Sequence, residues 1–427
     1  MSRFPRASRR HRAEKKRPPR AAKKSPARRG VFHAAGWEAL EPRMLLTAMP
    51  ATITWTGGSA TSANWSDAAN WDLGRAPING DSLVFPASAK QLANSDDIAG
   101  LSVNSIAFQG AFTASTGGYT LSGDDLTVGA GGITDNGSNS NGGSATIANQ
   151  IDFNVALAAA QHWSIADSGL GHDLTVNGNV ANNGFALTAY GTGTIDIGGE
   201  MSGGGELYAA GVPAGFTSSQ TPGGAFGGLT LNLSHSNGYT GGTHVGDYAT
   251  VVVSTDSALG PGGTNDAGTT VSQSGTIQFN AVAYTAPEAI TLDGGTLEAS
   301  GTSSFSGAIS ISGTPSDATI SAAFGAPFDA AIRLMAPSAT FTLNGPTIAN
   351  HGSDNLLVQG DFYPPAENGS PRAAGPGVII NNVVSGSGGL TVTAGALALG
   401  AANTYQGPTY LVGAATLIID ADNAIPS

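Results

Sequence analysis

Carboxylates are the most plentiful side chains in this sequence that could do chemistry: it has 30 Asp and Glu among 427 residues. The doublets Asp96-Asp97 and Asp124-Asp125 are candidates for the paired acids of a glycoside hydrolase. Adjacent residues on a strand point to opposite faces, so neither doublet forms an acid/base pair by sequence alone. Asp135, Asp152 and Asp173 stand singly. We interpret these acids as turn residues and solubilising charges.

Histidine is the other residue that could bind a metal or exchange protons near neutral pH. The sequence has His11, His33, His162, His172, His235, His244 and His351. None are three or four apart, as a helical metal pair requires, and His162 and His172 could meet only if coils stack. Residues 131–137 have the composition of a calcium-binding turn but lack its tandem nonapeptides. We expect no metal, cofactor-binding or catalytic residue, and calcium dependence stays open.

Other enzymatic signatures are also missing from the sequence. There is no cysteine for a thiolate zinc site or a nucleophile, and the glycine-rich stretches do not precede helices as they do in nucleotide-binding motifs. An enzyme acting on acidic sugars needs cations, and beyond residue 48 the chain has only Arg75, Lys90, Arg333 and Arg372. We expect no enzyme. The alternative is a carbohydrate-active enzyme with two carboxylates about 5 to 10 Å apart in an aromatic-lined groove.

The elements that position these residues are short strands. Apolar residues recur two apart in runs separated by Gly, Asn, Asp and Ser, as in Leu229/Leu231/Leu233 and Leu397/Leu399, and this period of two is typical of strands with one buried face. The chain has 62 Gly and 22 Pro but is only 11% charged and 40% hydrophobic, which argues against disorder of the body. The sequence predicts an all-β fold.

The segment at residues 1–48 differs from this body in charge. It holds 14 of the 18 Lys and Arg and 3 acids, a net charge of 14 − 3 = +11, whereas the rest has 4 − 27 = −23. Proline and charge repulsion predict a disordered basic segment. A nucleic-acid arm is the alternative, but no groove-reading fold follows, so we expect no nucleic-acid partner. Residues 31–48 are too short and too charged to form a transmembrane helix.

A motif follows this basic segment. Residues 36–47 read Gly-Trp-Glu-Ala-Leu-Glu-Pro-Arg-Met-Leu-Leu-Thr. They resemble the N-terminal LEPR-XLL domain of repeat-rich bacterial surface proteins, although Thr47 stands where a serine is common. The resemblance implies contact with an export machinery through this segment, and an extracellular or cell-surface location, associated with the outer membrane of a bacterium.

The body contains internal repeats. Residues 237–245 align without gaps with residues 403–411, 166 positions later, and each copy follows a Gly-Gly-Leu-Thr sequence. A unit that returns with loose spacing is typical of stacked β-coils. The clearest copies span 227–261 and 388–427. The sequence stops within the second copy, so we expect that the protein continues or that another chain covers this end.

These copies resemble the autotransporter-associated β-strand repeat, whose features are a Gly-Gly-Leu strand, an Asn-x-Tyr-x-Gly-x-Thr turn and an apolar strand. Trp55, Trp65 and Trp71 lie in a segment similar to the tryptophan-rich start of such regions. The resemblance implies a right-handed parallel β-helix, or β-solenoid, over residues 49–427, after the leader at 1–48, and the three tryptophans could cap its first coil.

The expected function is therefore that of a non-enzymatic, exported surface protein, structural or adhesive, resembling a passenger stalk. Cell-surface glycans or other surface proteins are the expected partners. Exposed rings at Tyr119, Tyr239, Tyr405 or Tyr410 could stack on sugars, but we expect the repeated Tyr239 and Tyr405 to pack inside a corner of the coil.

Overall fold

The computed structural model describes a large part of the chain. The described residues are 49–113, 117–139, 147–166, 172–211, 228–246, 248–272, 274–312, 328–335, 340–351, 355–359 and 377–427. Contacts divide the chain into two units, Met1–Thr47 and Ala48–Ser427. The predicted disorder of the leader and its LEPR-XLL-like motif lie outside the described residues, so only the second unit is considered below.

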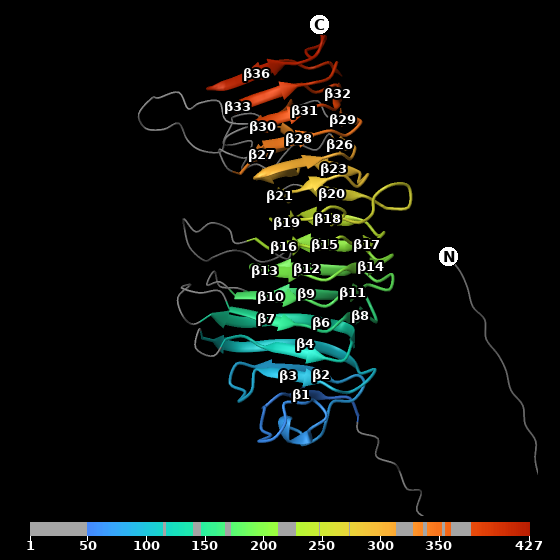
Figure 1. Ribbon diagram of the computed structural model, residues 1–427, viewed down its shortest axis with the longest axis vertical. Helices are drawn as coiled ribbons and strands as arrows, with labels where there is room; N and C mark the ends of the chain where they lie inside the picture. Colours follow the sequence, from blue (N-terminus) through green and yellow to red (C-terminus); the bar gives the residue numbers. More distant parts are fainter. Residues whose placement is uncertain are drawn as a thin grey trace, which may run out of the picture. The chain divides into compact units, whose positions relative to one another are not determined.

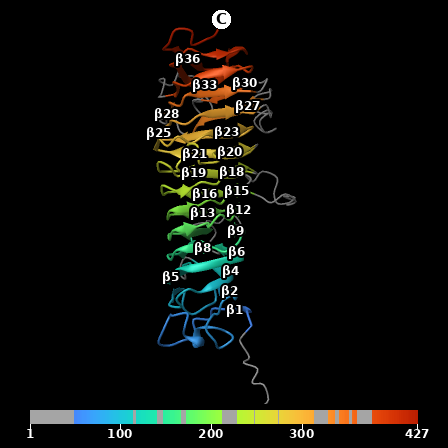
Figure 2. The same cartoon turned by 90° about the vertical axis from the view of Figure 1, so that its right-hand side faces the viewer.

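The second unit is a parallel β-solenoid, which confirms the predicted fold class. Its short strands lie one above another from β1 to β36 in two views at right angles (Figures 1 and 2). Within the described part of the chain, every pairing between named strands is parallel, and the antiparallel contacts are two isolated bridges. Each turn of the chain therefore adds a coil to the stack.

The strands form long sheets along the stack. The first sheet contains β1 (Thr52–Thr54), β2 (Ser82–Pro86), β4 (Ser102–Phe112), β6 (Leu126–Asn139), β8 (Val155–Leu157), β9 (Gln161–Ile165), β11 (Val180–Ala181), β12 (Leu187–Gly191), β14 (Met201–Gly203), β15 (Leu207–Ala210), β17 (Gly238–Tyr239), β18 (Thr243–Gly246), β20 (Thr269–Ser272), β23 (Ile290–Asp293), β26 (Ile309–Ile311), β29 (Thr347–Asn350), β32 (Val383–Gly386) and β34 (Thr404–Tyr405).

Two further sheets complete the coils. The second contains β3 (Ala93–Asp96), β5 (Thr120–Gly123), β7 (Ile147–Ile151), β10 (His172–Val176), β13 (Thr194–Ile197), β16 (Thr230–Leu233), β19 (Thr250–Val253), β21 (Thr276–Asn280), β24 (Thr296–Ser300), β27 (Phe328–Leu334), β30 (Asn355–Gln359), β33 (Leu390–Leu399) and β35 (Thr409–Leu411). The third contains β22 (Ala283–Tyr284), β25 (Thr302–Phe305), β28 (Thr340–Leu343), β31 (Val378–Ile380), the end of β33, and β36 (Ala415–Ile419).

The core consists of inward-facing side chains stacked in columns. In the first sheet, Trp163 lies in register with Ala189, which is followed by Ala209 and Val245. All four are buried. The two alanines leave room beside the large indole, as close packing of the interior requires.

Coil length varies while this register holds. Ile309 pairs with Ile290 in one direction along the stack and with Ile348 in the other. The chain between Ile309 and Ile348 is about twice as long as that between Ile290 and Ile309. The described strands on either side keep their pairing, so the inward positions stay in register whatever the length of the coil. This explains why the sequence repeats its pattern but not its spacing.

Glycine is required where one coil passes close to its neighbour. Gly123 has φ +114°, and a Cβ there would lie 1.9 Å from the carbonyl oxygen of Asp96 in the preceding coil. Gly191, with φ +135°, would place a Cβ 1.8 Å from the carbonyl oxygen of Ile165. Both positions exclude any side chain, which accounts for part of the high glycine content.

An aromatic cap closes the N-terminal end of the solenoid, as the sequence predicts. Trp55 and Trp71 form an antiparallel bridge with ring centroids 5.1 Å apart, and Trp65 lies 6.0 Å from Trp71. These rings pack on Phe85 of β2, and the 3-10 helix η1 (Ala68–Asn70) lies between the last two tryptophans. The segment occupies the end of the stack below β1 (Figure 1).

Candidate functional site

The repeated Asn-x-Tyr-x-Gly-x-Thr motif is the first place to look for a site, and its polar side chains are used inside the coil. The Asn237 side chain accepts a hydrogen bond from the Met201 N–H, 2.7 Å away in the preceding coil, and donates to the Ala258 carbonyl at 2.6 Å. The Tyr239 hydroxyl is 2.5 Å from that of Thr243. All three motif residues are buried.

The second copy makes the same contacts. Asn403 accepts from the Val384 N–H at 2.8 Å and donates to the Ala424 carbonyl at 2.6 Å. The Tyr405 hydroxyl lies 2.6 Å from that of Thr409. The motif is therefore a tie between coils, in which the asparagine satisfies backbone groups that the strands leave unpaired.

Three of the four tyrosines considered for sugar stacking are not available to a ligand. Tyr119, Tyr239 and Tyr405 are at most 3% exposed. The prediction that Tyr239 and Tyr405 pack inside a corner of the coil is confirmed. Tyr410 is 54% exposed and lies in the last coil.

A strip of rings on the outer face of the first sheet is the best candidate for a binding surface. It consists of His162 in β9, Tyr190 in β12, Tyr208 in β15 and His244 in β18. His162 and Tyr190 meet edge to face at 5.6 Å, and Tyr208 and His244 stack at 4.6 Å with 17° between their planes. We call these four residues the ring strip.

Glu206 adds a carboxylate to the ring strip. Its Oε2 accepts a hydrogen bond of 2.6 Å from the Tyr208 hydroxyl, and its Oε1 is 3.8 Å from Nε2 of His244. The hydrogen bond to Glu206 raises the pKa of Tyr208. The side chains of Glu206 and His244 are 50% and 38% exposed. The strip thus offers rings and a hydrogen-bond acceptor to solvent, whereas Nε2 of His244 is itself buried and has no hydrogen-bond partner.

The sequence did not single out this strip. Tyr190 and Tyr208 had no motif around them, and His162 and His244 are far apart along the chain. Only the coil register brings these strands together, since His162 pairs with Thr188, Thr188 with Tyr208, and Tyr208 with His244. The sequence did offer one indication of the strip: its four residues occupy outward positions in the alternating pattern of their strands.

The acidic doublets do not behave as paired acids. Asp97 is exposed and accepts hydrogen bonds from the side chains of Asn64 and Ser66 near the N-terminal cap. Asp96 is 1% exposed, and burial, with the charges of Asp124 and Asp97, raises its pKa to about 7. Its Oδ1 accepts from the Ile98 N–H, whereas Oδ2 has no hydrogen-bond partner. The hydrogen bond that the Asp96 side chain makes is therefore with the backbone of the turn that follows β3.

Other acids serve the corners of the coils. Asp125 accepts from the Asn154 side chain at 2.9 Å, and Asp152 accepts from that of Asn177 at 2.7 Å, both at exposed positions. The Asp135 side chain accepts from the Gly137 N–H at 2.9 Å. The predicted role as turn residues agrees with these contacts for Asp125 and Asp152. It is wrong for Asp135, which is buried within β6 and also accepts a hydrogen bond of 2.8 Å from the Asn149 side chain.

Glu288 is a buried acid in the coil that follows the first motif copy. It is fully buried, and its Oε1 accepts a hydrogen bond of 2.6 Å from the Thr269 hydroxyl, whereas Oε2 has no partner. Burial, with the nearby charge of Asp266, raises the pKa of Glu288 to about 8. This carboxyl therefore carries a proton through most of the physiological range.

Two of the four body cations form ion pairs with acids. Arg75 contacts the buried Asp81 through both terminal nitrogens, at 2.6 and 2.9 Å, in the N-terminal cap. Arg333 lies 3.4 Å from Glu298. Lys90 is exposed, and Arg372 lies outside the described residues. These described cations do not converge on one site.

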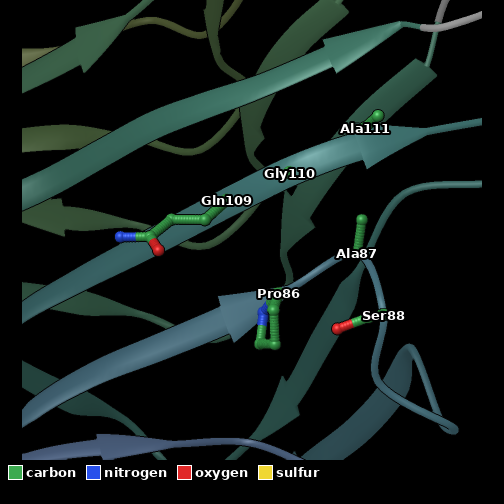
Figure 3. Close-up of a pocket in the computed structure, with 6 residues that line it drawn as sticks. All are labelled: Pro86, Ala87, Ser88, Gln109, Gly110 and Ala111. Atoms are coloured by element: carbon green, nitrogen blue, oxygen red, sulfur yellow. The ribbon is translucent and has the colours of Figure 1, made fainter.

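A shallow hollow near the N-terminal end is lined by six residues that include no acid, base or histidine. Figure 3 shows its lining residues: Pro86, Ala87, Ser88, Gln109, Gly110 and Ala111. None of the six ionises. Among the residues that the structure describes, no group of three or more His, Asp or Glu could hold a metal ion. His162 and His172 belong to strands of different sheets.

Comparison with protein-family models, with curated proteins and with solved structures finds no match for this chain. The resemblance to the autotransporter-associated repeat and to the LEPR-XLL domain therefore stays a prediction that rests on the residues quoted above. Within the described residues, no helix has the length and apolarity needed to cross a membrane.

The hydrogen bonds of Asn237 to neighbouring backbone predict that replacing this residue lowers the free energy of unfolding substantially. Asn237→Ala leaves the Met201 N–H and the Ala258 carbonyl unpaired in the core, and each orphaned group costs about 1–3 kcal/mol. We expect the free energy of unfolding, measured by denaturant titration followed by circular dichroism, to fall by about 2–5 kcal/mol. The control is Asn177→Ala, which removes an exposed hydrogen bond and should cost under about 1 kcal/mol. Equal effects of the two changes would contradict the tie.

Glu288 predicts a pH dependence of stability. Its pKa of about 8 lies above its usual 4.5, so the folded state binds the proton more tightly than the unfolded state. This stabilisation is complete below pH 4.5 and is lost as pH rises towards 8. In denaturant titrations at pH 5 and 8.5, Glu288→Gln should remove this loss, whereas Glu200→Gln at an exposed position should retain it. A Glu288→Gln variant with the wild-type pH profile would refute the assignment.

Proposed function

We propose that this chain is a non-enzymatic bacterial surface protein, exported by means of its N-terminal segment, whose solenoid acts as a structural or adhesive stalk. The observation that carries the proposal is the use of the repeated motif inside the solenoid. Of the most strongly repeated polar residues, Asn237 and Asn403 tie coil to coil, while the hydroxyls of Tyr239 and Tyr405 bond to the threonine within their own motif copy. Repetition in this chain therefore serves the length and cohesion of a stack.

The charge distribution supports export and exposure. The +11 segment at residues 1–48 and the −23 body are electrostatically distinct, as expected for a targeting segment and an exposed solenoid. The body carries few charges for its size, and Thr, Ser and Asn fill many outward positions of its strands. Residues 36–47 also support a surface location, because they resemble the LEPR-XLL domain of bacterial surface proteins.

Export can be tested with an epitope tag fused after Ser427. The full chain and a variant lacking residues 1–48 are expressed in a bacterium whose own surface proteins carry the LEPR-XLL motif. We expect antibody to label the tag on intact cells only for the full chain, with both proteins present at equal levels in lysates. Labelling of lysed but not intact cells for the full chain would refute export to the surface.

The ring strip supports the adhesive form of the stalk, with glycans as the partner. A sugar has an apolar C–H face and a rim of hydroxyls, and it is bound by amphipathic rings beside a hydrogen-bond acceptor. Tyr208 and His244 lie beside the Glu206 carboxylate in this way. The strip crosses four paired strands, so it can contact an extended chain of sugars.

The double change Tyr208→Ala with His244→Ala tests this surface on a glycan array. We expect binding to fall about tenfold or more, because the loss of one good contact corresponds to about that factor. Thermal melting should change little, since both side chains face outward. Tyr248→Ala, which removes a 48% exposed tyrosine outside the strip, is the control. Unchanged binding by the double variant, or no glycan bound by the wild type, would exclude the strip as a glycan site.

A further inference from the structure

The ring strip lies in a long stretch of the chain that carries no Lys or Arg. Residues 91–332 contain 19 Asp and Glu and not one Lys or Arg. The four strands that carry the strip, β9, β12, β15 and β18, belong to this stretch and lie one above another in the stack (Figure 1). An acidic surface of this kind repels anionic ligands and attracts cationic ones.

Glu206 places one of these negative charges beside the rings. Its Oε2 accepts a hydrogen bond of 2.6 Å from the Tyr208 hydroxyl, which uses one of the roughly four acceptor positions of a carboxylate. Its Oε1 lies 3.8 Å from Nε2 of His244, too far for a hydrogen bond. The Glu206 side chain is 50% exposed. Acceptor positions of this carboxylate are therefore open to donors of a ligand.

Tyr208 supplies an aromatic ring next to the same carboxylate. One face of the ring stacks on His244 of the following coil, at 4.6 Å. The neighbour in register on the other side is Thr188 of the preceding coil, which has a short side chain. The face of a tyrosine ring attracts a cation through its quadrupole. An ammonium group beside Tyr208 is thus attracted by the ring and by Glu206 together.

This combination of groups discriminates between classes of sugar. Recognition of a sugar carboxylate needs a cationic side chain, and the stretch around the strip has no Lys or Arg. A neutral sugar can stack on the rings but gains nothing from the negative charge. A sugar with a free amino group uses both features, because its C–H face packs on a ring while its ammonium group donates to the carboxylate.

We propose that the ring strip binds glycans whose sugars carry free amino groups. The ammonium group of one sugar donates to Glu206 and lies beside Tyr208, and further sugars extend along the neighbouring coils toward Tyr190 and His162. This inference rests on the glycan binding proposed above and narrows it to one class of sugar.

Titration calorimetry on the full chain compares three oligosaccharides of equal length: glucosamine, N-acetylglucosamine and galacturonic acid. At pH 6 the glucosamine amines are protonated. We expect the glucosamine oligomer to bind about tenfold more tightly than the N-acetylated one, as one exposed ion pair and one cation–π contact allow. The acidic oligomer should not bind detectably. Equal binding of the first two, or tighter binding of the acidic one, would overturn the inference, whereas the proposed glycan binding fails only if no glycan on the array binds.

Glu206→Gln tests whether the preference arises at the strip. Glutamine keeps an oxygen that can accept from Tyr208 but removes the charge, so we expect the glucosamine oligomer to bind about tenfold more weakly and the N-acetylated one to bind as before. The matched control is Glu200→Gln, which removes the same charge at an exposed position outside the strip and should bind like the wild type. Equal weakening by both changes would mean attraction to the acidic body as a whole and would overturn the site.

An oligolysine with as many ammonium groups as the glucosamine oligomer separates a glycan from a cationic peptide. It carries the charge without sugar rings, so it cannot stack on Tyr208 in the same way. We expect it to bind at least about tenfold more weakly than the glucosamine oligomer. Equal binding that is lost in Glu206→Gln would assign the strip to cationic peptides and overturn the proposal.

Discussion

Stacking of each coil on the next in register is the constraint on which the rest of this structure depends. A single coil has no core of its own, because its inward side chains are covered only by the coils on either side. The two motif copies show this directly: Val253 is buried between neighbours, whereas Ile419 at the corresponding position is half exposed. Stability in such a stack is a property of the contacts between coils.

Corners are where this constraint is hardest to meet, and several buried asparagines lie there. At a corner the backbone leaves the sheet, so its N–H and C=O groups need other partners. Asn237 and Asn403 supply them between coils, and the Asn182 side chain does the same for the N–H and carbonyl of Gly205. These asparagines therefore act as structural parts of the stack.

The alternation of apolar residues and the motif copies were sufficient to predict an all-β fold of stacked coils and the burial of Tyr239 and Tyr405, whereas the aromatic cap was expected from the resemblance of the tryptophan-rich segment. These features are local or repeat with a fixed pattern, so they can be read without knowing which coils are neighbours. The ring strip could not be predicted, because the variable length of the coils hides the register that brings Tyr208 beside His244. The burial of Glu288 was hidden for the same reason: its environment comes from Asp266 and from Thr269, which lies in the preceding coil, where β20 pairs with β23.

The packing of the core constrains the outward positions much less than the inward ones, and the proposed binding surface lies at outward positions. The inward column of the first sheet that runs from Trp163 through Ala189, Ala209 and Val245 continues with Val271, Leu292 and Ile311, and all of these side chains are apolar although they differ in size. The adjacent outward column reads Tyr208, His244, Thr270 and Thr291, in which rings give way to hydroxyls within two coils. The core does not require any of these outward side chains, and this freedom supports the proposal that the rings beside Glu206 contact a ligand.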